Sequence, residues 1–246
     1  MSIKVSVVIP TYNRFDYLLN AVSSIKDQNF NDFEILIIND GSTDENYYEN
    51  KLSETNIKQI DLEENQKIKN GFASDAIRNM GIENARGKYI AFLDDDDIWL
   101  SNKLNKQYNL LESSENKMSS TEGLFGFGTF NYKTKYKLFN EEYYFKTISK
   151  KYKNTKYFKK NFIFNKFDYP KIFDLSFIDI HNCIITSSVM IERELLIDVG
   201  MFDPTLKNGV GDYDCWLKVL EYTNCDYISD PLFYYDGSHG QGQNYK

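Results

Sequence analysis

Four consecutive aspartates, Asp94 to Asp97, are the residues of this sequence with the most evident chemistry. They directly follow an apolar run over residues 89–93, which is typical of a buried strand, so we expect their carboxylates to emerge together at the C-terminal edge of a sheet. Like charges this close destabilise one another unless a cation is shared among them. A divalent metal ion with a phosphorylated ligand on its far side would provide that cation. The alternative is a solvated acidic turn that binds nothing.

Two further polar turns follow other predicted strands. Thr11, Tyr12 and Arg14 come after the first strand of the chain, and Asp40 comes after the second. Because right-handed crossovers bring the carboxyl ends of parallel strands to one edge, we expect these turns and the aspartates to line a single crevice. Asp40 could accept hydrogen bonds from a base or a ribose, while the first turn offers hydroxyls, a ring and a cation. This set is typical of a nucleotide site with a metal-neutralised diphosphate.

The sequence lacks two common nucleotide-binding motifs. No G-x-G-x-x-G pattern follows the first strand, which argues against a dinucleotide site of the Rossmann type. No G-x-x-x-x-G-K-[ST] pattern is present either, which argues against a P-loop nucleotidase.

Strand and helix patterns alternate over the first hundred residues, which favours an α/β fold with a doubly wound, mostly parallel sheet. The predicted strands cover residues 5–9, 33–38, 57–62 and 89–93, and the predicted helices lie around residues 18–25 and 73–85. After a region with weaker patterns, further strands are predicted over residues 125–130 and 187–191, and helices over residues 193–199 and 212–222. No linker composition divides the chain. We therefore expect one domain over residues 1–246, with a nucleotide-sugar half (1–112), an insertion (113–183) and an acceptor-side half (184–246).

The bulk composition is that of a globular protein, with 41% hydrophobic and 16% aromatic residues in 246. No apolar run is long enough to span a membrane, and the N-terminus shows no signal-peptide pattern. The three cysteines, Cys183, Cys215 and Cys225, lack zinc spacing and indicate reduced thiols. We therefore expect a cytoplasmic location, in a bacterium with AT-rich coding or in the host of a large virus.

The segment from Lys133 to Lys171 carries twelve lysines against three acidic residues, although the whole chain has a net charge of -7. An acidic body with one basic segment is not typical of nucleic-acid binding. The segment could face an acidic acceptor or an anionic membrane surface, or it could be a solvated insertion. Its many tyrosines and phenylalanines could form a platform for an acceptor sugar, or they could pack the insertion onto the domain or form the interface of a homodimer.

Several segments, in order, resemble family-two glycosyltransferases, which have the GT-A fold. Residues 5–14 are similar to the opening strand of that family, and residues 40–44 to its second nucleotide-binding turn. Residues 78–90 resemble the helix and strand that precede the family's D-x-D motif, which here is Asp94-Asp95-Asp96. Residues 187–190, 200–203 and 211–217 resemble the acceptor-side segment and the catalytic-base motif. The resemblance spans about residues 3–112 and 184–235.

The resemblance implies transfer of a sugar, with inversion, from a nucleoside diphosphate sugar to an acceptor hydroxyl or amine. The expected donor is a UDP-sugar, and the acceptor is a glycan, a lipid-linked molecule or a protein. Asp212 would deprotonate the acceptor, and Asp96 would bind Mn²⁺ or Mg²⁺. The residues expected to contact the nucleotide sugar are Pro10, Thr11, Tyr12, Arg14, Asp40, Arg78, Asp94 and Asp95. The family's usual Glu-Asp pair is Gly211-Asp212 here, so a carboxylate that often helps to bind the acceptor is missing.

Two residues near these motifs are assigned as follows. His239 either gives the metal a third ligand in a segment that closes over the donor, or belongs to a glycine-rich tail. Asp97 is expected to cap the next helix, which separates it from the other three aspartates.

Two other functions remain open. A sugar-nucleotide nucleotidyltransferase would share the sheet and the metal, but it would need a glycine-rich, basic loop after the first strand, which residues 10–14 lack. A glycan-binding or scaffold protein that has lost activity would also share the fold, and Gly211 in place of glutamate is the feature that points to it.

Overall fold

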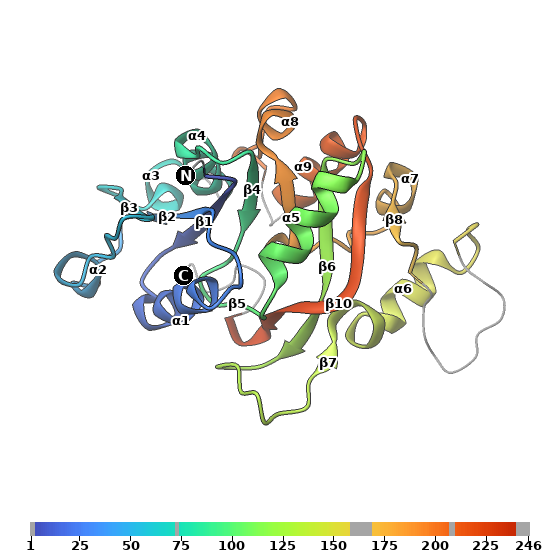
Figure 1. The fold of residues 1–246 in the computed structure, drawn as a ribbon, viewed down its shortest axis with the longest axis horizontal. Helices are drawn as coiled ribbons and strands as arrows, with labels where there is room; N and C mark the ends of the chain where they lie inside the picture. The colour runs from blue at the N-terminus through green and yellow to red at the C-terminus, as the bar shows by residue number, and fades with distance from the viewer. Residues whose placement is uncertain (1–2, 72–73, 158–168, 207–209, 240–246) are drawn as a thin grey trace.

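The computed structural model describes residues 3–71, 74–157, 169–206 and 210–239. Within these ranges the chain forms one mixed sheet of ten strands, in the order β3-β2-β1-β4-β9-β6-β10-β5, with β7 paired to β6 and β8 paired to β10 (Figure 1). None of the helices in these ranges has the length and apolar character needed to cross a membrane.

The N-terminal half of the sheet is parallel, as the alternating sequence patterns predict. Strand β1 pairs with β2 on one side and β4 on the other, and β2 pairs with β3, all in parallel register. Every residue of β1 and β2 is buried, because helices cover both faces of the sheet. The four strands are β1 (Val5–Thr11), β2 (Phe33–Asn39), β3 (Ile57–Asp61) and β4 (Tyr89–Phe92).

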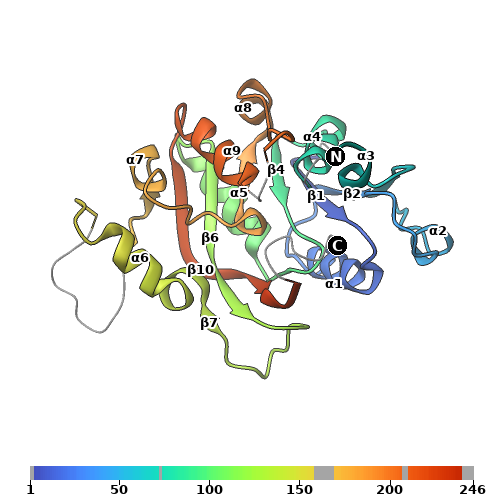
Figure 2. The same cartoon turned by 180° about the vertical axis from the view of Figure 1, so that it is seen from behind.

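Successive residues of β1 enter two different hydrophobic clusters, because side chains alternate across a strand. Val7 and Ile9 pack in the cluster that contains residues of α1 (Phe15–Lys26) and α5 (Lys103–Ser113). Val8 faces the opposite cluster, which contains residues of α4 (Ser74–Asn84) and α9 (Gly211–Leu220). Figure 1 shows α5 lying across the sheet, and Figure 2 shows α9 from the opposite side.

The other half of the sheet has mixed pairing. Strands β6 (Met118–Gly126) and β10 (Cys225–Asp236) run parallel, and β9 (Met190–Glu192) enters between β4 and β6 antiparallel to both. The strand predicted over residues 125–130 in fact begins at Met118 and ends at Gly126. Strand β10 was not predicted, and its C-terminal end pairs antiparallel with β5 (Ile98–Trp99), directly after the four aspartates.

The remaining elements are short, and all except β7 and β8, which belong to the sheet, lie around it. Residues 187–191, predicted as one strand, form a 3-10 turn (Thr186–Ser188) followed by β9. The other elements are α2 (Asn46–Glu49), α3 (Gln66–Asn70), β7 (Lys137–Leu138), a π-helix (Phe139–Tyr143), α6 (Phe145–Tyr152), β8 (Ile172–Phe173), α7 (Leu175–Ile178), α8 (Arg193–Asp198) and a 3-10 turn (Gly237–His239).

Part of the predicted insertion, the basic, aromatic segment over residues 133–171, is anchored to strand β6 of the sheet and to α7. Glu122, a fully buried carboxylate of β6, accepts hydrogen bonds from the backbone nitrogens of Asn140 (2.9 Å) and Glu141 (3.1 Å) at the start of the π-helix. Tyr152 of α6 is fully buried, and its hydroxyl donates to a carbonyl of α7. These contacts favour packing over an acceptor platform for this part of the insertion; residues 158–168 lie outside the described ranges.

Candidate active site

The structure brings the first polar turn and the aspartates into contact at the carboxyl edge of the sheet. Thr11, the last residue of β1, donates from Oγ1 to Oδ2 of Asp95 at 2.8 Å. Asp95 follows β4, which is the direct parallel neighbour of β1, so the pairing of these two strands sets the contact. Asp40 joins the same edge through its backbone nitrogen, which donates to the carbonyl oxygen of Thr11 at 2.9 Å.

Arg14 provides a cation that the neighbouring aspartates share. Its Nη1 lies 3.0 Å from Oδ1 of Asp95 and 2.8 Å from Oδ2 of Asp96. The Tyr47 hydroxyl holds this turn, because it accepts from the backbone nitrogen of Arg14 (3.0 Å) and hydrogen-bonds to Thr11 (2.5 Å). Burial raises the pKa of Asp95 to about 7 and that of Asp96 to about 6; neighbouring aspartates add to this, and Arg14 opposes it. A further cation at this point would therefore stabilise the ionised carboxylates.

His239 lies against the aspartates, although it is far from them in the sequence. Its Nδ1 is 3.4 Å from Oδ2 of Asp96 and 3.6 Å from Oδ2 of Asp236. The imidazole meets the Tyr17 ring edge-on, with centroids 4.5 Å apart. Strand β10 ends at Asp236, and the 3-10 turn after it directs the histidine back over the cluster. The structure therefore places His239 beside the expected metal ligand; residues 240–246 lie outside the described ranges.

Asp97 does not cap a helix, so that prediction was wrong. The next helix, α5, begins after Asn102, because the chain first forms β5 along the end of β10. The carboxylate of Asp97 is buried and accepts from Ser187 Oγ (2.6 Å) and from the backbone nitrogen of Asp236 (3.0 Å). Burial raises its pKa well above the ordinary range. Asp97 thus ties the end of β10, and with it His239, to the aspartate cluster.

Arg78 pairs with one carboxylate of the aspartate cluster and with a second carboxylate of its own helix. It is buried in α4, and its Nη2 is 2.6 Å from Oδ1 of Asp94 while its Nη1 is 3.4 Å from Oδ1 of Asp75. Its charge also opposes the effect of burial on Asp212. Arg78, predicted as a donor contact, is therefore the cation that connects Asp94 with the carboxylates near α9.

Asp212 lies in the first turn of α9, and one of its two carboxylate oxygens makes only long hydrogen bonds. Its Oδ1 accepts from the backbone nitrogen of Tyr213 at 2.7 Å, whereas its Oδ2 is 3.5 Å from both Asn182 Nδ2 and Thr186 Oγ1. Burial raises the pKa of Asp212 to about 6, although Arg78 lowers it. A carboxylate that is mostly ionised at neutral pH, with a pKa close to that pH, suits a general base.

The carboxylate of Asp40 is engaged by the chain itself. Oδ2 accepts from Asn65 Nδ2 and Oδ1 accepts from the backbone nitrogen of Gln66, both at 2.8 Å. Burial raises the pKa of Asp40 to about 6. Of the other predicted donor contacts, Pro10 is buried in β1 opposite Ile38, and Tyr12 is half-buried in the turn that follows.

Four residues of this edge had no predicted role. Tyr47 holds the first turn, and Asp75 pairs with Arg78. Ser187 donates a hydrogen bond to the Asp97 carboxylate from its hydroxyl, and Asp236 donates one from its backbone nitrogen. The sequence offered a signal for Ser187, because this residue begins the segment that resembles the acceptor side of the family. The other three are single polar residues that no local pattern distinguishes.

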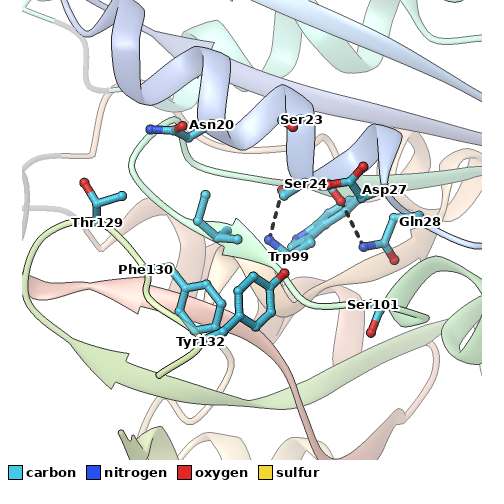
Figure 3. A pocket seen from close by; sticks show the side chains of 11 residues that line it. Asn20, Ser23, Ser24, Asp27, Gln28, Trp99, Ser101, Thr129, Phe130 and Tyr132 are labelled. Atoms are coloured by element: carbon cyan, nitrogen blue, oxygen red, sulfur yellow. Dashed lines mark hydrogen bonds between the residues drawn. The ribbon is translucent and has the colours of Figure 1, made fainter. Parts of the chain in front are cut away.

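A separate cavity of about 170 Å³ opens beside α1 (Figure 3). Trp99 lies at its base, where its backbone nitrogen donates to Ser24 Oγ at 3.1 Å. None of the predicted site residues lines it. The lining residues are Asn20, Ser23, Ser24, Asp27, Gln28, Ile98, Trp99, Ser101, Thr129, Phe130 and Tyr132.

The fit of a divalent metal depends on Asp96 and His239. Among the described residues there is no group of three or more His, Cys, Asp or Glu arranged to hold a metal ion. The Nδ1 atom of His239 is nevertheless buried without a hydrogen bond, 3.4 Å from the Asp96 carboxylate. Mg²⁺ is commonly held by one or two carboxylates and completes its shell with substrate phosphates and water. Asp96, with the His239 nitrogen beside it, therefore fits a metal that binds together with a diphosphate.

Comparison with known sequences identifies the family. Residues 6–177, more than half of the 246-residue chain, match the family described as glycosyl transferase family 2. This agrees with the resemblance seen in the sequence motifs.

Curated relatives carry glycosyltransferase names. An uncharacterized glycosyltransferase of Rickettsia felis is 43% identical over 119 residues, which cover 48% of this chain and 19% of that protein. One of Rickettsia prowazekii is 31% identical over 225 residues, covering 89% of this chain and 59% of that protein. The UDP-Glc:alpha-D-GlcNAc-diphosphoundecaprenol beta-1,3-glucosyltransferase WfgD of Escherichia coli is 34% identical over 107 residues, 44% of this chain and 40% of WfgD. The chain therefore spans less than two thirds of the length of each relative.

Solved structures share the fold. S. aureus TarS 1–349 in complex with UDP-GlcNAc has a TM-score of 0.66 and 20% identity, covering 99% of this chain and 61% of that chain. The mannosyltransferase PcManGT from Pyrobaculum calidifontis, in complex with GDP-Man and Mn²⁺, has a TM-score of 0.60 and 14% identity, covering 94% of this chain and 56% of that chain. At these identities the likeness shows the fold alone. The chain, with its aspartates at the carboxyl edge of an α/β sheet, has the GT-A fold and belongs to glycosyl transferase family 2.

Proposed function

We propose that this glycosyltransferase moves a hexosyl or N-acetylhexosaminyl group, with inversion, from a UDP-sugar to an acceptor hydroxyl or amine. The observation that carries the proposal is the buried Arg78, whose guanidinium pairs with Asp94 of the cluster at 2.6 Å and with Asp75 at 3.4 Å. The Asp75 carboxylate lies against Gly211, the residue that precedes Asp212. One buried cation thus joins the carboxylates proposed for the donor side to the start of the helix that carries the proposed base. UDP is favoured because TarS is seen with UDP-GlcNAc and WfgD is named for UDP-Glc.

On the donor side, the predicted contacts are the first turn, Asp40 and the cluster. Thr11 and Arg14 hold Asp95 in place, and Arg14 carries a charge that can pair with a phosphate as well as with a carboxylate. Asp96 and His239 would hold Mn²⁺ or Mg²⁺, which supplies positive charge to the leaving diphosphate when it is bound. PcManGT is seen with Mn²⁺, which supports this choice of cofactor.

On the acceptor side, Asp212 takes the proton of the attacking hydroxyl or amine. The acceptor atom forms a bond to the anomeric carbon as the bond from that carbon to the diphosphate oxygen breaks, and the diphosphate leaves with the electron pair. A single displacement of this kind inverts the anomeric centre. A glycan, lipid-linked or protein acceptor suits this step, and WfgD is named for a diphosphoundecaprenol acceptor.

The proposal is tested by a donor screen. Wild type and Asp96→Ala are incubated with UDP-, GDP- and dTDP-sugars and Mn²⁺, and release of the nucleoside diphosphate is followed. Asp214→Ala is the matched control, because Asp214 lies in α9 and pairs with Lys218 at 3.1 Å. We expect UDP release by wild type and Asp214→Ala and a loss of at least about 100-fold in Asp96→Ala.

Two outcomes would select the alternatives. Release of pyrophosphate from a nucleoside triphosphate and a sugar phosphate would indicate a nucleotidyltransferase. No hydrolysis and no nucleotide binding with any donor would indicate a scaffold protein.

A further inference from the structure

Asp75 and Gly211 meet side by side, although they begin two helices that are far apart in the sequence. Asp75 is in the first turn of α4, and Gly211 is the first residue of α9. A Cβ atom added to Gly211 would lie 2.1 Å from Oδ2 and 2.6 Å from Cγ of Asp75. The carboxylate of Asp75 therefore fills the space that a side chain at position 211 would need.

This carboxylate belongs to a buried charge group around Asp212. The side chain of Asp75 is 5% exposed. The guanidinium of Arg78 contacts two carboxylates, those of Asp75 and Asp94. The charges of Asp75 and Asp94 both act on Asp212, the residue that follows Gly211. Asp75 and Arg78 are buried, whereas Asp94 and Asp212 are half-buried. Three carboxylates around one arginine leave an excess of negative charge at this point, which is unfavourable for stability and is typical of functional sites.

We propose that Asp75 is a positioning residue for the acceptor-side base: it provides from α4 the acidic group that position 211 lacks, and it fixes Arg78 and the first turn of α9 so that Asp212 is aimed at the acceptor. This inference rests on the proposed function. It follows that positions 75 and 211 can hold one acidic side chain between them, from either helix, but not two.

The experiment exchanges the carboxylate between the two positions. Asp75→Asn, Gly211→Glu and the double variant Asp75→Ala/Gly211→Glu are assayed for sugar transfer at saturating donor, with donor hydrolysis in parallel. We expect Asp75→Asn to lower kcat of transfer by about 10- to 100-fold, because Asp212 would lose its position against the acceptor. The KM for the donor and the rate of donor hydrolysis should stay near their wild-type values. Gly211→Glu alone should lose transfer by a similar factor, and the double variant should recover most of it.

Two results would overturn the inference: full transfer by Asp75→Asn, or a double variant no more active than Gly211→Glu. Wild type that transfers no sugar with any donor would remove the proposed function, and the positioning role with it. Normal wild-type transfer with an unaffected Asp75→Asn would reject the positioning role alone.

A measurement of thermal stability tests whether side chains at positions 75 and 211 compete for the same space, and it needs no activity assay. Gly211→Ala should lower Tm by about 4 °C or more in the wild-type background, because its Cβ collides with the Asp75 carboxylate. In the Asp75→Ala background the same change should have little effect. Equal Tm shifts in the two backgrounds would show that the two positions do not compete.

Discussion

Sugar transfer should weaken as pH falls through about 6, because Asp212 must be ionised to accept a proton. Burial raises its pKa to about 6, although the charge of Arg78 lowers it. One pH unit below that value about one tenth of the carboxyls are ionised, so kcat at pH 5 should be about 10-fold below its plateau. At pH 7 about nine tenths are ionised, so the plateau should be nearly reached.

Removing the positive charge of Arg78 tests more sharply whether the ionisation of Asp212 controls transfer. Arg78→Gln takes away the charge that opposes burial, so the pKa of Asp212 should rise and the acid limb should move to higher pH. The assay is kcat of transfer between pH 5 and 8 at saturating donor and acceptor, for wild type, Arg78→Gln and Asp212→Asn. Donor hydrolysis measured in parallel separates this limb from the titration of Asp95 and Asp96, which are the proposed donor-side residues.

The residual activity of Asp212→Asn should show no limb near pH 6. A wild-type kcat that is flat from pH 5 to 8, or an Arg78→Gln limb at lower pH, would refute the role of Asp212 as the base.

Three further changes have defined outcomes. Gly81→Ala would bring a Cβ to 2.3 Å from Val8 Cγ1, so urea unfolding should show a loss of about 1–3 kcal/mol, with an unchanged slope. Glu34→Gln should reduce stability by about 1–3 kcal/mol at pH 7. Burial raises the pKa of Glu34, but its hydrogen bonds with Arg86 and Ser6 outweigh burial and hold the pKa below 4.5. The stability that the ionised Glu34 contributes is therefore present above pH 4.5 and is lost as pH falls through the folded-state pKa. The stability difference between wild type and Glu34→Gln should accordingly shrink at pH 3. His239→Ala should weaken UDP binding with Mn²⁺ by about 10-fold in calorimetry, without affecting metal-free binding. The control is His181→Asn, because His181 lies between α7 and the 3-10 turn at Thr186–Ser188, and this change should leave both affinities unchanged.

The parallel half of the sheet was predictable because its signal is local. Residues 5–9 and 89–93 are almost entirely apolar, as expected of strands covered on both faces, and both strands lie where that pattern placed them. Once the order of these elements is known, the carboxyl ends must share an edge, so the meeting of Thr11 with the aspartates followed.

Strand β10 could not be read from the sequence for an equally local reason. Asp226, Asp230 and Pro231 interrupt its apolar pattern, and its pairing with β6 shifts register around Pro231. Its apolar residues Leu232 to Tyr234 are buried because β5 and β6 pair on either side of the strand and distant segments pack on its faces. The error at Asp97 has the same origin, because the partner of that carboxylate is the backbone of β10.

The sequence by itself determined the family, the α/β sheet and the edge at which polar turns gather, since these depend on periodicity and on residue types in order. Only the tertiary structure decided what each carboxylate contacts. Asp97 holds β10, Asp40 is bound by the 65–66 turn, and Asp75 fills the space beside Gly211. The physical reason is that these contacts join segments distant in the sequence, and their geometry is set by how whole helices pack on the sheet. No local pattern encodes that packing.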